Sequence, residues 1–88
     1  MHKTEKRLLK TLGIDENLIP EDYDSWSGAL WSYCNDLESY DYALSYAWEM
    51  FDEETGKGKT EYEKAVKEYD ADLEQLREEV LSYIGELK

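Results

Sequence analysis

Residues 26–51 read WSGALWSYCNDLESYDYALSYAWEMF, and apolar or aromatic side chains recur in this stretch at steps of 4, 3, 4, 3, 4, 3 and 4 positions. The series, which we name the first seam, consists of Trp26, Leu30, Tyr33, Leu37, Tyr40, Leu44, Ala47 and Phe51. A repeat of about 3.5 residues places all of them on one side of an α-helix, as in a coiled coil. The first seam therefore predicts a long amphipathic helix that packs against another helix.

The start and the continuity of this helix are less strongly specified than its seam. Pro20 suits a first helical position, with acidic residues directly after it, and Asp24 or Ser25 is an equally good start. The polar segment 36–39 favours caps and turns, so a break there is the alternative to a continuous helix. Because the seam keeps its phase through this segment, we expect one helix that runs to about Glu54.

A second seam of the same phase follows the strongest turn signal in the chain, the glycine-containing segment 54–59. Thr60 and Glu63 have the spacing of a capping box, which predicts a helix start at Thr60. The second seam consists of Tyr62, Val66, Tyr69, Leu73, Leu76, Val80, Tyr83 and Leu87. Two seams of equal length joined by a short loop predict an antiparallel helical hairpin.

A short helix is expected before the hairpin, from Thr4 to Leu12, with leucines on one side. Gly13 suits the residue that ends such a helix, and Ile14 suits the hydrophobic contact that accompanies this type of cap. We expect this helix to lie across the hairpin. Residues 1–88 then form a single all-α domain, a three-helix bundle with a long hairpin.

The net charge of −12 is unevenly distributed along the chain. Residues 1–10 carry a net charge of +3, residues 11–56 carry twelve acids and no Lys or Arg, and residues 57–88 carry a net charge of −3. Such a chain repels nucleic acid and anionic membranes and attracts basic surfaces. Direct binding of nucleic acid is therefore not expected, and neither is membrane binding.

The sequence offers little that could support catalysis or a cofactor. His2 is the only histidine, and Cys34 is the only cysteine, so no histidine-based triad and no two-histidine metal site can form. The segment 56–60 resembles the end of a phosphate-binding loop, but position 53, where that motif needs glycine, holds Glu53. We expect no enzymatic activity, no cofactor and no metal. A single cysteine and no signal-like segment favour a cytoplasmic location, in the host cell if a phage encodes the chain.

The side of the long helix opposite the first seam carries aromatic and acidic residues where a solvated face usually mixes charges of both signs. We name as the back face the residues Trp31, Glu38, Tyr42, Tyr46, Glu49 and Glu53. Two structural explanations are open: the N-terminal helix packs on this face through Leu8, Leu9, Leu12, Ile14 and Leu18, or the chain forms a homodimer through it. The functional explanation is that tyrosines and carboxylates form a partner-binding surface.

In size, charge and composition over its whole length, the chain resembles the small phage-type inhibitors that mimic DNA, such as anti-CRISPR and anti-restriction proteins. No motif is diagnostic of that class. The resemblance implies a non-enzymatic inhibitor that occludes the basic nucleic-acid-binding surface of a partner, such as a CRISPR effector or another bacterial defence nuclease. Two alternatives are a coiled-coil adaptor or oligomerisation module and an antitoxin-like partner protein. A monomer and a homodimer are both compatible with the sequence.

Overall fold

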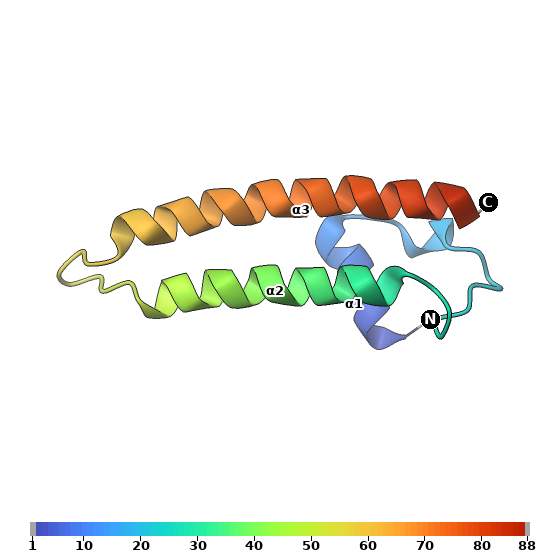
Figure 1. The fold of residues 1–88 in the computed structure, drawn as a ribbon, viewed down its shortest axis with the longest axis horizontal. Helices are drawn as coiled ribbons and strands as arrows, with labels where there is room; N and C mark the ends of the chain where they lie inside the picture. Colours follow the sequence, from blue (N-terminus) through green and yellow to red (C-terminus); the bar gives the residue numbers. More distant parts are fainter. Residues whose placement is uncertain (1, 88) are drawn as a thin grey trace.

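The protein is an all-α three-helix bundle in the computed structural model, which describes residues 2–87 (Figure 1). Its elements are α1 (Lys3–Leu12), a short 3₁₀ turn η1 (Glu16–Leu18), α2 (Leu30–Glu49) and α3 (Lys59–Leu87). The helices α2 and α3 run antiparallel as a hairpin, and α1 lies across one end of it (Figure 1). The molecule is elongated, with extents of 53 × 20 × 17 Å. The predicted fold class is confirmed.

The core occupies only the end of the hairpin that α1 covers. It is formed by Leu8, Leu9, Leu12, Ile14, Ile19, Leu30, Cys34, Leu37, Leu76, Val80 and Ile84. None of residues 38–75 is fully buried. We name these residues the arm; they form the far half of the hairpin, where α2 and α3 pack mainly on each other and α1 contacts the near end through the ion pair of Arg7 with Asp41 (Figure 1).

The helix α1 forms as the sequence predicts, because both of its ends are capped locally. The His2 side chain accepts a hydrogen bond from the Thr4 N–H, and the Glu5 carboxylate accepts one from the His2 N–H, which completes a capping box. At the other end, Gly13 has a φ of 69°, and the Ile14 N–H donates to the Leu9 carbonyl at 2.8 Å. The prediction that Gly13 ends the helix is thus confirmed, and Ile14 joins Leu9 and Leu12 in the buried core, as predicted for this type of cap.

The start predicted for the long helix at Pro20, Asp24 or Ser25 is wrong, since α2 begins at Leu30. The Asp24 carboxylate instead accepts hydrogen bonds from the Trp26 N–H and the Ser27 hydroxyl, which stabilises a turn in competition with a helix. Trp26 consequently lies outside the helix and is 96% exposed, so it is not a seam residue. The first seam holds from Leu30 onward, where every position is at least partly buried.

Two tyrosine hydroxyls satisfy the first backbone N–H groups of α2, whose N-cap residue makes no side-chain cap. The Ala29 N–H donates to the Tyr83 hydroxyl at 3.0 Å, and the Leu30 N–H donates to the Tyr23 hydroxyl at 3.4 Å. Such groups would otherwise lack a partner at a helix start. The position of this start therefore depends in part on Tyr83, which lies 54 residues away from Ala29 in the sequence, and local signals alone do not predict it.

The helix α2 is continuous through Asp36, as the phase of the seam predicts, but it ends at Glu49 and not near Glu54. Beyond it, the Asp52 carboxylate accepts hydrogen bonds from two N–H groups of the loop, and the Asp52 N–H donates to the Lys57 carbonyl. An Asx turn of this kind offers the backbone an alternative to the helix. The helix therefore ends before the predicted turn.

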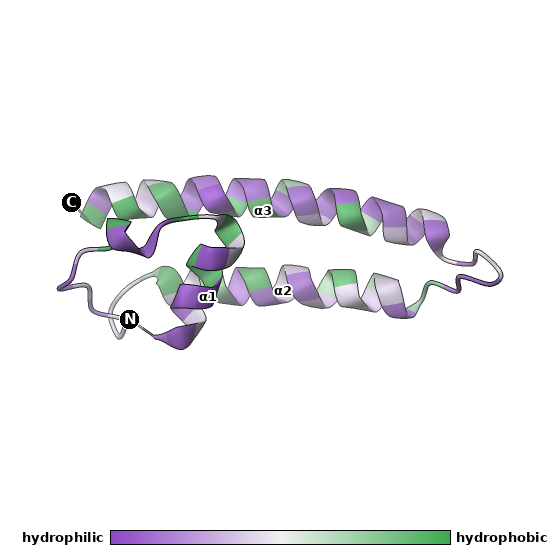
Figure 2. Cartoon of the chain, turned by 180° about the vertical axis from the view of Figure 1, so that it is seen from behind, coloured by the Kyte–Doolittle hydropathy of each residue, from purple (hydrophilic) through white to green (hydrophobic). Residues whose placement is uncertain are grey.

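The helix α3 begins at Lys59, so Thr60 lies inside the helix and the predicted capping box is not its start. The Tyr62 N–H donates to the carbonyl of Gly58, which precedes the helix with a φ of 82°. Every position of the second seam is buried or half-buried. Hydrophilic and hydrophobic residues alternate along the whole length of α3, as expected for a helix with one solvated side (Figure 2).

Candidate functional site

The back face defined from the sequence is an exposed side of α2 for most of its length. Tyr42 and Tyr46 are 74% and 56% exposed, and Trp31, at the start of α2, is 38% exposed. Glu38 and Glu49 are exposed on the same helix, and their spacing places them on the side of the tyrosines. Helical geometry thus brings five of the six predicted residues together. Glu53 lies beyond the end of α2, in the turn before α3.

The acids of the back face are unpaired within the described chain. The ion pairs among residues 2–87 join Arg7 to Asp41 and Lys64 to Glu68. Glu38, Glu49 and Glu53 therefore face water without a cation of residues 2–87. Their charge is available to attract an external basic group, although salt screens exposed charges beyond about 8–10 Å.

The helix α1 does not cover the back face, contrary to one of the two structural explanations. It contacts the neighbouring side of α2, where the Cys34 thiol donates to the Thr4 carbonyl and the Arg7 guanidinium donates to Asp41. His2, the residue that caps the start of α1, lies against Trp31 of the back face, with their ring centroids 4.9 Å apart. The helix α1 does not cover Tyr42 or Tyr46, and both side chains are exposed.

A second aromatic surface, which the sequence reasoning did not single out, lies at the tip of the arm. We name it the tip cluster: Trp48, Phe51 and Tyr62, whose ring centroids are 5.3–6.0 Å apart. Aromatic pairs at this distance attract one another. Trp48 is nevertheless 52% exposed. The sequence carries a signal for this cluster, since Phe51 ends the first seam, Tyr62 begins the second seam, and an antiparallel hairpin brings these two ends together.

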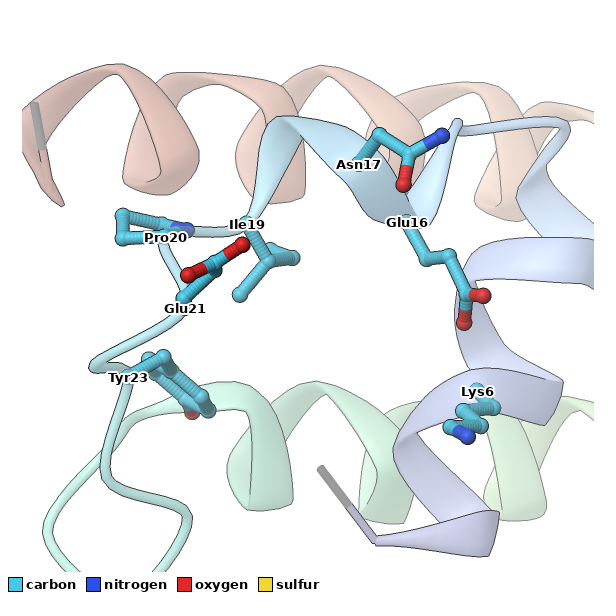
Figure 3. Close-up of a pocket in the computed structure, with 7 residues that line it drawn as sticks. All are labelled: Lys6, Glu16, Asn17, Ile19, Pro20, Glu21 and Tyr23. Carbon is cyan, nitrogen blue, oxygen red and sulfur yellow. The ribbon is translucent and has the colours of Figure 1, made fainter.

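The hollow between α1, η1 and the segment after η1 is a mixed polar site (Figure 3). Glu16 and Lys6 come from different elements and both border it, and Ile19 and Pro20 form its apolar wall. Tyr23 also borders the hollow, but its hydroxyl already serves the start of α2. Burial raises the pKa of this hydroxyl above its ordinary value, so it stays a neutral phenol. We therefore attribute the hollow to the packing of the segment between η1 and α2 and not to a ligand.

Cys34 is a buried core residue, as its position beside the first seam predicts. It is 3% exposed, and burial, followed by the nearby carboxylates of Glu5 and Glu38, raises the pKa of its thiol to about 11. A reactive cysteine needs a stabilised thiolate, and this environment does the opposite. Cys34 therefore contributes packing and not nucleophilic chemistry.

Within residues 2–87, no three His, Cys, Asp or Glu side chains are grouped in a way that could hold a metal ion. None of the helices in this part of the chain is long and apolar enough to cross a membrane. No protein-family model, no curated protein and no solved structure matches the chain.

Proposed function

We propose that this protein is a non-enzymatic inhibitor that binds and occludes the basic nucleic-acid-binding surface of another protein. The observation that carries the proposal is the exposure of Tyr42 and Tyr46 on α2 between carboxylates that have no cation partner among residues 2–87. Partly solvated carboxylates attract a basic surface over a distance, and tyrosines supply contacts that become desolvated on binding. The back face combines both.

Occlusion of a basic channel is supported better than faithful imitation of a duplex. DNA carries one charge per roughly 1.7 Å of axis, or about twelve charges in 20 Å. From Asp36 to Glu49, a helical length of about 20 Å, α2 carries four acids: Asp36, Glu38, Asp41 and Glu49. One of these, Asp41, is already paired with Arg7. The charge density of α2 is thus far below that of a duplex.

The nature of the target rests on the resemblance to small phage-type inhibitors. That resemblance favours a bacterial defence nuclease, such as a CRISPR effector, whose channel for nucleic acid is lined by Lys and Arg. An antitoxin-like role would use the same electrostatics with a different basic target. In both cases the basic residues belong to the partner.

The proposal is tested by competition between the protein and labelled DNA for a purified CRISPR effector nuclease. We expect the protein to displace the DNA, and the double variant Glu38→Lys/Glu49→Lys to associate at least about tenfold more slowly, because rim charges act mainly on the association rate. Tyr42→Ala should instead speed dissociation about tenfold, which corresponds to about 1.4 kcal/mol.

The matched control is Glu74→Lys/Glu78→Lys, which changes the net charge equally but alters exposed acids of α3. If both double variants slow association to the same extent, only net charge matters and the back face is not the contact surface. If none of a panel of nucleases that differ in their nucleic-acid channel is inhibited, the proposed function is wrong.

The second candidate function, an oligomerisation module, is favoured by one observation, the absence of fully buried residues in the arm. Pairing of two arms would bury their seams. The arm carries twelve acids and four bases, a net charge of −8, which opposes its association with a second copy. Molar mass by light scattering separates the candidates, because an oligomerisation module must be at least dimeric at physiological salt.

A further inference from the structure

The contacts between α1 and the hairpin show what kind of segment the hairpin binds. Along α2, the contacted positions include Cys34 and Asp41, which are seven residues apart. On α3, the Arg77 guanidinium donates to the Leu12 carbonyl at the end of α1. The helix α1 thus crosses both helices of the hairpin on one side, which we name the α1 side.

The α1 side continues along the arm beyond the end of the α1 contacts. A further seven residues along α2 from Asp41 leads to Trp48, and seven residues back along α3 from Arg77 leads to Asp70 and then to Glu63. Residues seven apart lie on nearly the same side of a helix. Asp70 and Glu63 are exposed, and Trp48 is 52% exposed although one part of its ring packs against Phe51 and Tyr62.

The uncovered length suits one more crossing helix. Eight residues separate Asp41 from Glu49, the end of α2, which is about 12 Å at 1.5 Å per residue. Packed helices lie about 8–10 Å apart. A helix beside α1 would therefore meet Trp48 of the tip cluster, whereas a helix pair would not fit.

The chemistry of α1 indicates the chemistry of such a helix. It carries Lys3, Lys6, Arg7 and Lys10 against a single acid, Glu5, and it buries Leu8, Leu9 and Leu12. Arg7 binds Asp41, which also accepts a hydrogen bond of 2.7 Å from the Tyr69 hydroxyl. On the α1 side of α3, the base Arg77 is followed toward the tip by the acids Asp70 and Glu63, with Lys67 between these two acids. Asp70, Glu63 and Lys67 together carry a net charge of −1, so this part of α3 favours cations.

We propose that the α1 side of the arm is a docking site for a basic amphipathic helix of the partner protein, which lies beside α1 with its apolar residues on Trp48 and its cations at Asp70 and Glu63. The inference deepens the proposed function and rests on it for the identity of the partner. A second copy of the chain is disfavoured as the occupant by the net charge of −8 on each arm.

The test uses a synthetic amphipathic helical peptide of Leu and Lys, with a matched peptide in which Glu replaces every Lys. We expect the Leu/Lys peptide to shift the indole NMR signal of Trp48 and to bind with an affinity that falls as salt rises. The Leu/Glu peptide should not bind. Equal binding of both peptides would overturn the proposal, because apolar contact alone would then explain it.

Variants locate the site on the full-length protein. Trp48→Ala should weaken peptide binding about tenfold, whereas Trp26→Ala, which removes an exposed tryptophan outside the arm, should change it less than twofold. Asp70→Lys/Glu63→Lys should also weaken binding about tenfold, and circular dichroism should show an unchanged fold because both side chains are exposed. Unchanged affinity in Trp48→Ala and in the double charge variant would overturn the proposal.

Two further outcomes separate this inference from its rivals. A dimer in light scattering that Trp48→Ala converts to a monomer would make a second copy the occupant and would overturn the proposal. Tyr42→Ala lies on the back face, so it should weaken competition with DNA without changing peptide binding. If Tyr42→Ala weakens competition with DNA but neither Trp48→Ala nor Asp70→Lys/Glu63→Lys weakens peptide binding, this inference is wrong and the proposed function stands.

Discussion

At the scale of single residues, burial determines the protonation state of Tyr69 and of Cys34. The hydroxyl of Tyr69 has its pKa raised to about 12 by burial and by its hydrogen bond to Asp41, and burial raises the pKa of the Cys34 thiol to about 11. Both groups are neutral in the folded protein at physiological pH. Because each folded-state pKa lies above its ordinary value, the stability that these groups contribute is present at neutral pH and is lost as pH rises.

We expect the Cys34 thiol to resist iodoacetamide at pH 8 in the native protein and to react at the rate of a free cysteine in denaturant. The free energy of unfolding should fall as pH rises from about 9 towards 11, because the thiol and the tyrosines ionise first in the unfolded chain. Mass spectrometry measures the alkylation, and urea titrations measure the stability. Rapid alkylation of the native protein at pH 8 would contradict the burial of Cys34.

At the scale of elements, the loop between α2 and α3 depends on backbone conformations that few residues adopt. Gly58 has a φ of 82°, and a Cβ placed on it would lie 2.5 Å from the Met50 carbonyl oxygen. Gly85 in α3 differs, since nothing lies within 4 Å of the place that its Cβ would occupy. Replacement of glycine by alanine should therefore lower the stability of the protein at position 58 and raise it at position 85.

Gly58→Ala should destabilise the protein by about 1–3 kcal/mol, since it combines a left-handed conformation with a backbone clash. Gly85→Ala is the matched control and should stabilise by about 0.5–1 kcal/mol, because alanine loses less entropy in a helix. Thermal and urea unfolding measure both changes. A stability loss in Gly85→Ala equal to that in Gly58→Ala would show that this α3 site is crowded and that the loop is not special.

At the scale of the whole molecule, stability and binding surface are divided between the two ends. The end with α1 holds every fully buried core residue, and the arm holds the tip cluster and most of the back face. Few buried contacts predict low local stability. The arm should therefore exchange its amide hydrogens faster than the core end, even though α2 and α3 run through both.

Leu76 and Leu44 test this division, since both are seam leucines expected to be core by sequence. Leu76 is 1% exposed in the core end, whereas Leu44 lies half-buried in the arm. Leu76→Ala should cost about 2–5 kcal/mol, and Leu44→Ala about 1 kcal/mol, because less apolar area leaves contact. Urea unfolding measures both changes. Equal losses would mean that the arm is packed as tightly as the core end.

The repeats in the sequence determine most of the fold. The phase of the two seams predicts the antiparallel hairpin and the continuity of α2, and Gly13 with Ile14 predicts the end of α1. These features are local or periodic, so neighbouring residues suffice to specify them. The same periodicity identified the side of α2 on which Tyr42 and Tyr46 are exposed.

Local turns at Asp24 and Asp52 decided part of the rest. The tertiary structure decided what remains, through contacts between residues that are distant in the chain. The start of α2 depends on the hydroxyls of Tyr23 and Tyr83. Tyr83 accepts a hydrogen bond from the N–H group of Ala29, which lies 54 residues away in the sequence. The position of α1 depends on its contacts with Asp41 and Arg77. In this position α1 leaves Tyr42 and Tyr46 of the back face exposed, and Trp48 near the tip of the arm is exposed as well. Sequence periodicity shows which side of a helix is apolar, but only packing shows how much of that side another segment covers.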